Sequence, residues 1–170
     1  MTETLHNLLG QEDPASLPQI ERALASQDEL SQDQEAVLSA LIWRRCTQGS
    51  AGLLGSVLQR DCAQRIEEMP THLEAVGASD AAAATQELVD AIPLDDDRIK
   101  AGLVDWIDTQ TDVVRKAREL GTGLEDIDRA IWEFMKDPTT EIPDLPISTR
   151  AQILLAKLRA FFSPGTAETS

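Results

Sequence analysis

The chain has 170 residues, 42% of them hydrophobic, and its 30 acidic and 15 basic residues give a net charge of −15. This length and hydrophobic content predict one domain with a core of its own. The charge argues against direct binding to DNA or RNA, because the main electrostatic contribution to such affinity would be repulsive.

Apolar residues recur with α-helical spacing along almost the whole chain, and alternating runs typical of strands are missing. The fold class is therefore predicted to be all-α, a single-domain bundle of about seven or eight helices. Residues 1–162 form this domain, and residues 163–170 are expected to be a flexible tail. In chain order, we expect helices over residues 2–9, 17–26, 31–48, 50–76, 80–92, 96–120, 124–136 and 148–162.

Serine and proline residues mark several of these helix ends. Ser31 and Ser79 stand directly before helical patterns and are predicted N-caps. Pro70 is expected to kink or break the segment at 50–76, because proline lacks the N–H that a helix interior requires. The segment at 96–120 is expected to be the longest uninterrupted helix.

Cys46 and Cys62 each lie inside a helical pattern, which predicts buried, reduced thiols rather than a disulfide framework. No apolar run approaches the roughly 18–20 residues of a membrane span. The N-terminus lacks the basic and apolar regions of a signal peptide. We therefore expect a soluble, cytoplasmic protein without membrane contact.

No sequence pattern of a metal, cofactor or phosphate site is found. Asp95, Asp96 and Asp97 suggest a calcium loop, but Lys100 and Trp106 occupy the positions that such a loop reserves for glycine and glutamate. We interpret the three aspartates as residues that cap a helix and favour its positive N-terminal end. We predict no metal and no cofactor.

Candidate nucleophiles are equally weak. No local pattern joins Cys46 or Cys62 to His72 as a nucleophile–base pair. The glycines at 49, 52 and 55 lack the lysine or arginine that a phosphate loop normally adds, so they predict a tight turn between packed helices. The protein is therefore predicted not to be an enzyme.

Residues 67–112 hold most of the negative charge. This segment contains twelve acidic residues and two basic residues, Arg98 and Lys100, so its net charge is −10. It also carries apolar residues at helical spacing, such as Leu73, Leu88 and Leu103, and is therefore expected to fold. A folded surface with concentrated negative charge attracts a basic protein and repels nucleic acid.

The helix predicted at 96–120 places Asp105, Asp108 and Asp112 along one edge, opposite the apolar face that includes Ile107. Neighbouring carboxylates on such an edge lie about 5–6 Å apart at their Cβ atoms. This spacing is comparable to that of backbone phosphates. A solvated acidic edge on an ordinary soluble helix has the same pattern, so both readings stay open.

Three segments resemble a family of small, all-helical bacterial proteins. The resemblance spans residues 36–134, about 60% of the chain. Its motifs are Leu41-Ile-Trp with Gly49-Ser-Ala-Gly-Leu-Leu-Gly-Ser-Val-Leu58, Leu73-Glu-Ala-Val-Gly-Ala78 continuing to Ala91-Ile-Pro93, and Leu124-Glu-Asp-Ile-Asp128 with Phe134.

One characterised branch of that family is a DNA mimic that antagonises a transcription factor. The resemblance implies a helical fold of this type, and it implies DNA mimicry for this chain. The family's glycine turn usually carries paired asparagines, paired glycines and a phenylalanine, whereas this chain has Ser50, Ala51, Gly52 and Leu53.

The leading hypothesis is an acidic, bacterial regulator of transcription that mimics DNA and occupies the nucleic-acid-binding surface of a basic, DNA-binding protein. Two alternatives stay open: an immunity or inhibitor protein for a basic toxin, and a chaperone-like interaction module with an apolar groove. Arg150, Lys157 and Arg159, in the last predicted helix, leave a homodimer open as well. The predicted partner-binding residues are Glu67, Glu68, Asp90, Asp95, Asp96, Asp97, Asp105, Asp108 and Asp112.

Overall fold

The computed structural model describes residues 3–121, 127–144 and 146–147. The all-α prediction is confirmed: eleven α-helices lie within these ranges, more than the sequence predicts, because two long predicted helices are each divided. The helix predicted at 148–162, the tail at 163–170 and the start of the helix predicted at 124–136 lie outside the described residues.

The elements follow one another closely along the chain. The α-helices are α1 (Leu5–Leu9), α2 (Leu17–Ala25), α3 (Gln32–Thr47), α4 (Gly55–Leu58), α5 (Arg60–Ala63), α6 (Met69–Ala75), α7 (Ser79–Val89), α8 (Asp97–Ala101), α9 (Leu103–Asp108), α10 (Thr111–Leu120) and α11 (Ile127–Lys136). Short 3-10 turns, η1 (Pro14–Ser16) and η2 (Gly52–Leu54), precede α2 and α4.

One small strand pair was not predicted. β1 (Glu3–Thr4) and β2 (Pro146–Ile147) run antiparallel, with Glu3 opposite Ile147 and Thr4 opposite Pro146. The helix predicted at 2–9 therefore begins only at Leu5.

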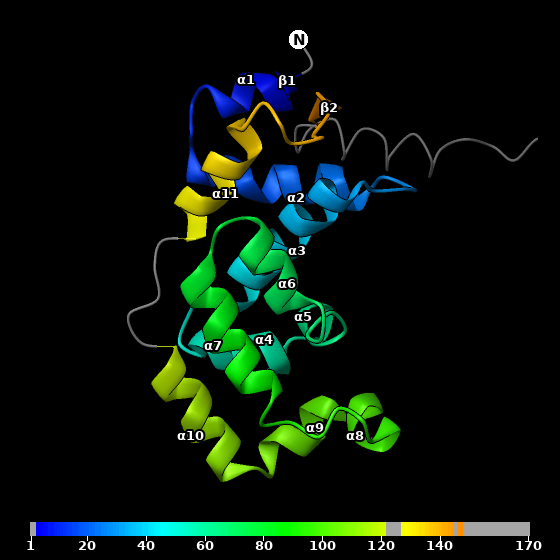
Figure 1. Ribbon diagram of the computed structural model, residues 1–170, viewed down its shortest axis with the longest axis vertical. Coiled ribbons are helices and arrows are strands. Elements are labelled where there is room, and N and C mark those ends of the chain that lie inside the picture. Colours follow the sequence, from blue (N-terminus) through cyan, green and yellow to red (C-terminus); the bar gives the residue numbers. More distant parts are fainter. Residues whose placement is uncertain (1–2, 122–126, 145, 148–170) are drawn as a thin grey trace, which may run out of the picture.

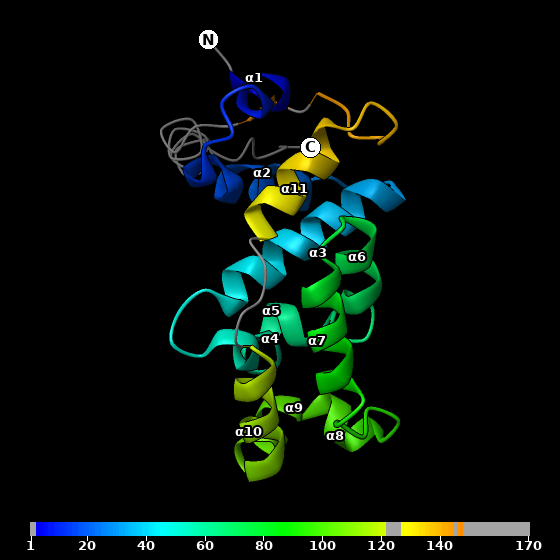
Figure 2. The same ribbon diagram turned by 60° about the vertical axis from the view of Figure 1, so that its left-hand side comes forward.

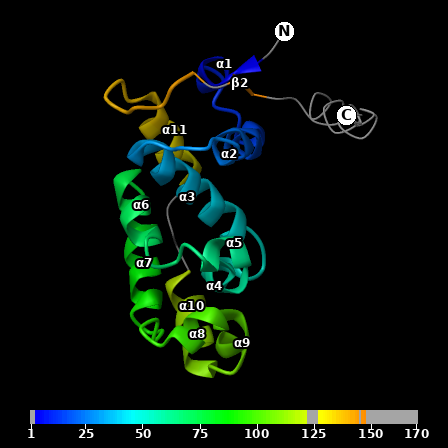
Figure 3. The ribbon, with the colours of Figure 1, turned by 90° about the vertical axis from the view of Figure 1, so that its right-hand side faces the viewer.

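Helix α3 lies at the centre of the molecule. It packs against α2, α4, α5, α6 and α11. Figure 1 shows α1, α2 and α11 at one end of the long axis and α8, α9 and α10 at the other. Figure 3 shows α8 and α9 below α4 and α5, in agreement with the contacts of α9 with both of those helices.

The N-terminus of α3 is fixed by the predicted cap. The Ser31 hydroxyl accepts a hydrogen bond from the Gln34 N–H at 3.3 Å, and the Gln34 side-chain oxygen accepts one from the Ser31 N–H at 2.7 Å. This reciprocal capping box satisfies two N–H groups that would otherwise lack a partner. Ten of the sixteen residues of α3 are buried, which is typical of a helix surrounded by protein.

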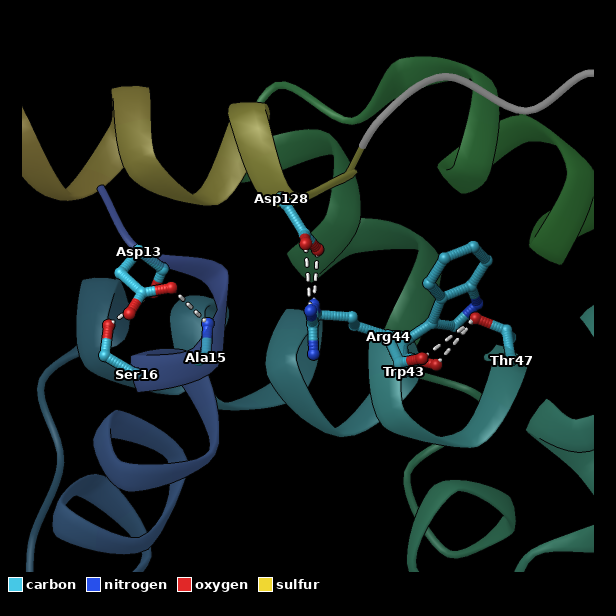
Figure 4. A network of polar contacts seen from close by, with 7 residues as sticks. All are labelled: Asp13, Ala15, Ser16, Trp43, Arg44, Thr47 and Asp128. Atoms are coloured by element: carbon cyan, nitrogen blue, oxygen red, sulfur yellow. Dashed lines mark hydrogen bonds and ion pairs between the residues drawn. The ribbon is translucent and has the colours of Figure 1, made fainter. Parts of the chain in front are cut away.

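Two polar contacts tie α3 to more distant helices. The Trp43 Nε1 donates a hydrogen bond to the buried Thr85 hydroxyl of α7 at 3.0 Å. The Arg44 guanidinium binds the Asp128 carboxylate of α11 through both oxygens, with 2.8 Å between Nη2 and Oδ2 (Figure 4). Both partners of this ion pair are mostly shielded from solvent, and it joins α11 to the core helix.

The helix predicted over 50–76, kinked or broken at Pro70, is broken close to that proline, but it is also divided where no break was predicted. It divides at Gln59, whose φ of −91° and ψ of 124° are extended, and again in the turns before Met69. Pro70 stands in the first turn of α6, where it starts a helix rather than bending one. The Gln59 side chain donates to the Cys46 carbonyl at 2.9 Å, which holds this break against the C-terminal end of α3.

The predicted cap at Ser79 is also wrong. Ser79 is the first residue of α7, Ala78 is its N-cap, and no side chain caps that helix. The Ser79 hydroxyl instead donates to the Glu74 carboxylate of α6 at 3.1 Å. The turn between α6 and α7 is made by Gly77, whose φ of +81° favours glycine.

The uninterrupted helix predicted at 96–120 is wrong as well. It is divided into α8, α9 and α10, with breaks at Gly102 and at Thr109–Gln110. A straight helix of this length would extend about 37 Å and carry its two ends far apart. The chain instead turns back, so that α9 packs against α4 and α5 while α10 packs against α7 and η2.

Buried side chains explain these two directions. Leu103 and Ile107 of α9 and Val113 and Ala117 of α10 are all buried in the same core. The Trp106 carbonyl, near the C-terminal end of α9, accepts hydrogen bonds from the Thr109 N–H at 3.0 Å and from the Thr109 hydroxyl at 2.7 Å. Within the described ranges, no helix combines the length and apolar character required to cross a lipid bilayer.

The close contact between α3 and α4 predicts that one added methyl group at Gly55 strongly lowers stability. A Cβ atom at Gly55 would lie 1.9 Å from the Cys46 carbonyl oxygen, a backbone atom that cannot move aside. We expect Gly55→Ala to lower the free energy of unfolding by at least about 2 kcal/mol, because it overpacks this contact. Chemical denaturation followed by circular dichroism measures it.

Gly10→Ala is the matched control, because its Cβ would meet only the Asn7 carbonyl oxygen at 3.8 Å. We expect this variant to unfold within about 0.5 kcal/mol of the wild type. Equal stability of the two variants would contradict the close packing of α4 on α3.

Candidate functional site: an acidic end beside an apolar cavity

All nine predicted partner-binding residues lie within the described ranges. Eight of them are exposed, and Asp96 is half-exposed. They come from the turn before α6, the end of α7, the segment leading into α8, and helices α8, α9 and α10. Figure 2 shows α8, α9, α10 and the end of α7 together at one end of the molecule, away from α1, α2 and α11. The predicted carboxylates therefore gather at one end of the fold, where α8 also carries Arg98 and Lys100, and α10 carries Arg115, Lys116 and Arg118.

Three of these carboxylates converge on one lysine. Lys100 of α8 forms an ion pair with Glu67, which lies 33 residues earlier in the chain. The hydrogen bond with Glu67 and the negative charges of Asp97 and Glu68 hold the pKa of Lys100 above its ordinary value. We call Glu67, Glu68, Asp97 and Lys100 the Lys100 cluster. Its members come from two segments that the fold brings together.

The three aspartates at 95–97 have different roles. The Asp96 carboxylate accepts a hydrogen bond from the Arg98 N–H at 2.9 Å and is the N-cap of α8, so capping is confirmed for this residue. Asp97 is the first residue of α8 and belongs to the Lys100 cluster. Asp95 is exposed and makes no side-chain hydrogen bond or ion pair with the described residues.

The single acidic edge predicted on a helix at 96–120 does not exist as such. Asp105 and Asp108 share α9, one turn apart, but Asp112 lies beyond the break, in the first turn of α10. The reason is the reversal of the chain at Thr109–Gln110, which buries Val113 and Ala117 against other helices.

The carboxylates of this region differ in how far they are already neutralised. The Asp112 carboxylate lies 3.3 Å from Arg115, whose other nitrogen binds Glu119 at 3.0 Å; these hydrogen bonds, the one with Glu119 first, raise the pKa of Arg115. Asp90 accepts a hydrogen bond from Gln86 at 2.8 Å. Asp105 and Asp108 have no such side-chain partner among the described residues.

A cavity of about 480 Å³ adjoins the Lys100 cluster. It lies between α5 with the turn after it and helices α8 and α9. Charged and polar groups from Arg60, Gln64, Glu67, Lys100 and Asp105 line part of it. The apolar part of its wall comes from Ala63, Ile66, Leu94, Ala101, Leu103 and Val104.

Sequence analysis missed this cavity. The available signal was Val104, an apolar residue on the polar side of the helix predicted at 96–120. Its exposed fraction is 36%, and no other large hydrophobic residue in the described ranges is exposed. Its meaning depends on Ile66 and Leu94, whose proximity no local pattern reveals.

The candidate nucleophiles do not form a catalytic arrangement. Cys46 and Cys62 are buried free thiols, as predicted. The interaction with the neighbouring Cys46 thiol, and then burial, raise the pKa of Cys62. The His72 Nδ1 lies 2.8 Å from the Ser39 hydroxyl rather than against a thiol, and Ser39 is fully buried, out of reach of a substrate.

No group of three or more histidine, cysteine, aspartate or glutamate side chains in the described part of the chain is arranged to hold a metal ion. No protein-family model, curated protein or solved structure matches the chain. The resemblance to the DNA-mimic family therefore stays a prediction from the sequence motifs, and the candidate site is defined by its charge and shape.

The separate roles of neighbouring aspartates can be tested directly. We expect Asp96→Ala to lower the free energy of unfolding by about 1 kcal/mol, because it removes the side-chain cap of α8. Hydrogen exchange at the Ile99 and Lys100 amides should also become faster, because both N–H groups bond to the Asp96 carbonyl in the first turn of α8, which the cap holds in place. Denaturation and exchange measured by nuclear magnetic resonance give both values.

Asp95→Ala is the matched control one residue away. It removes the same charge without removing a cap, and its stability should lie within about 0.5 kcal/mol of the wild type. If the two variants were equally stable, Asp96 would not be the cap of α8.

Proposed function

We propose that this protein is an acidic regulator that binds a basic, DNA-binding protein and occupies its nucleic-acid-binding surface, as a DNA mimic. The observation that carries the proposal is the exposure of eight of the nine predicted carboxylates, gathered on the end formed by α8, α9, α10 and the elements beside them. An excess of one sign of charge on a folded surface raises the association rate of an oppositely charged partner.

The carboxylates with the fewest internal partners support this role best. Asp95, Asp105 and Asp108 are exposed and lack a side-chain hydrogen bond or ion pair with the described residues. They contribute little to the fold, so their charge is available to lysine and arginine side chains of a partner. Asp96 and Asp112 are less available, because one caps α8 and the other pairs with Arg115.

The proposed surface is a patch formed by several elements rather than a straight row on one helix. The breaks at Gly102 and at Thr109–Gln110 give α8, α9 and α10 different directions. The carboxylates would therefore meet a partner from several angles. A basic protein carries the positive charge that complements these carboxylates, whereas nucleic acid is negative and would be repelled.

The proposal predicts binding that depends on both salt and position. The immobilised full-length protein is exposed to native lysate at low salt, and the bound protein is eluted with high salt and identified. We expect the bound protein to be a basic, DNA-binding protein. Added duplex DNA should also release it, because DNA and the immobilised protein would compete for the same surface of that partner. Salt weakens the complex because exposed charges are screened beyond about 8 Å at physiological ionic strength.

A charge-matched pair of triple variants locates the surface. Asp95→Asn, Asp105→Asn and Asp108→Asn together should weaken binding of that partner at least about tenfold. The control combines Asp28→Asn, Glu29→Gln and Glu35→Gln, which change the net charge equally near the start of α3, and should weaken binding less than about twofold. Equal weakening by both triples, or failure of DNA to compete, would contradict the proposal.

A further inference from the structure

The cavity beside the Lys100 cluster combines apolar surface with nearby charge. Val104, with an exposed fraction of 36%, forms part of its wall, together with Leu94 and Ile66. A single exposed hydrophobic side chain is ordinary on a protein surface. Val104 differs because it borders a hollow whose volume of about 480 Å³ lies in the roughly 300–1,000 Å³ range of ligand-binding pockets.

The cavity is lined by two carboxylates, Glu67 and Asp105, and by two cations, Arg60 and Lys100. Two further carboxylates, Glu68 and Asp97, lie close enough to act on Lys100 at the edge of the cavity. Lys100 is already engaged by Glu67, whereas Asp105 has no ion pair or side-chain hydrogen bond with the described residues. A positive charge brought to this edge would therefore meet more carboxylates than cations.

We propose that this cavity receives one bulky apolar side chain of a basic protein segment whose lysine and arginine residues contact the surrounding carboxylates. The inference rests on the proposed function, because it takes the partner to be a basic protein. It adds that the partner carries an apolar anchor next to its positive charges. The cavity would thus bind the apolar side chain, and the carboxylates around it would bind the basic side chains.

The two kinds of contact have different physical consequences. Charges on an exposed rim mainly raise the association rate and lose their effect in salt. An apolar side chain that fills a pocket at the centre of an interface contributes affinity that salt does not screen. The anchor would therefore select, among many basic proteins, those with an apolar residue at the right place.

The test uses two short synthetic lysine peptides, identical except for one central residue, which is tryptophan in the first and alanine in the second. Their affinities for the full-length protein are measured by fluorescence anisotropy at low and moderate salt. We expect the tryptophan peptide to bind at least about tenfold more tightly, as burial of a large apolar side chain predicts. Salt should weaken the binding of both peptides and leave the ratio of their affinities unchanged.

Two variants test whether the anchor enters this cavity. Val104→Ser removes apolar wall, and Ala101→Trp fills the space from the exposed last residue of α8. Either change should reduce the ratio of the two peptide affinities to less than about threefold without weakening the binding of the alanine peptide. Ala25→Trp is the matched control, because Ala25 is the exposed last residue of α2, at the other end of the molecule. Circular dichroism confirms folding, and Val104→Ser suffices if Ala101→Trp does not fold.

Arg60 separates this inference from a different ligand. It lines the cavity without an ion pair in the described ranges, so it would repel a basic segment but attract a carboxylate. Arg60→Gln should bind the tryptophan peptide as tightly as the wild type or more tightly. The opposite result has two parts: the protein binds dodecanoate and loses this binding in Arg60→Gln, and it binds the two peptides with equal affinity. That result would make the cavity a site for an anionic amphiphile and overturn the inference.

Other outcomes distinguish the inference from the proposed function. Equal affinities of the two peptides, both weakened by the Asp95, Asp105 and Asp108 triple variant, would overturn the anchor and keep the acidic surface. A ratio that persists in both Val104→Ser and Ala101→Trp would place the anchor elsewhere and also overturn the inference. Binding that neither salt nor the triple variant weakens would count against the proposed function itself.

Discussion

The burial of α3 on nearly all sides is the constraint on which the other helices depend. A helix with this many buried residues must be surrounded, and α2, α11, α6, α4 and α5 supply that cover from different directions. Two of its polar side chains bond to α7 and α11. Trp43 donates to Thr85 of α7, and Arg44 pairs with Asp128 of α11. The short helices and sharp turns after α3 follow from the need to cover it closely.

The close cover of α3 also determines where the acidic end lies. Gly55 allows α4 to pass within contact of the Cys46 carbonyl, and the chain then turns at Gln59 and again before α6. This path leaves Glu67 at the edge of the molecule, where α8 later brings Lys100 beside it. Eight of the nine carboxylates predicted to bind a partner are exposed here, on or beside helices whose apolar residues, such as Leu103 and Ile107, are buried in the core.

The same arrangement explains why an apolar cavity lies among charges. The reversal between α8, α9 and α10 buries Leu103 and Ile107 but leaves Val104 on the outer side of α9. Against it stand Ile66 and Leu94, from segments that reach this place by other routes. In the proposed interaction, the charges would speed association in a way that salt weakens. The cavity would select among basic partners, which a purely acidic surface cannot do.

The sequence by itself determined the helical class, the Ser31 cap of α3, the buried cysteines and the acidity of residues 67–112, because each of these follows from local spacing or composition. Only the tertiary structure decided where helices break, as at Gln59 and Gly102, since those breaks depend on the direction in which distant helices pack. It also decided that Glu67 meets Lys100 and that Val104 borders a cavity. Residues far apart in a sequence carry no local signal of the contact that the folded core imposes on them.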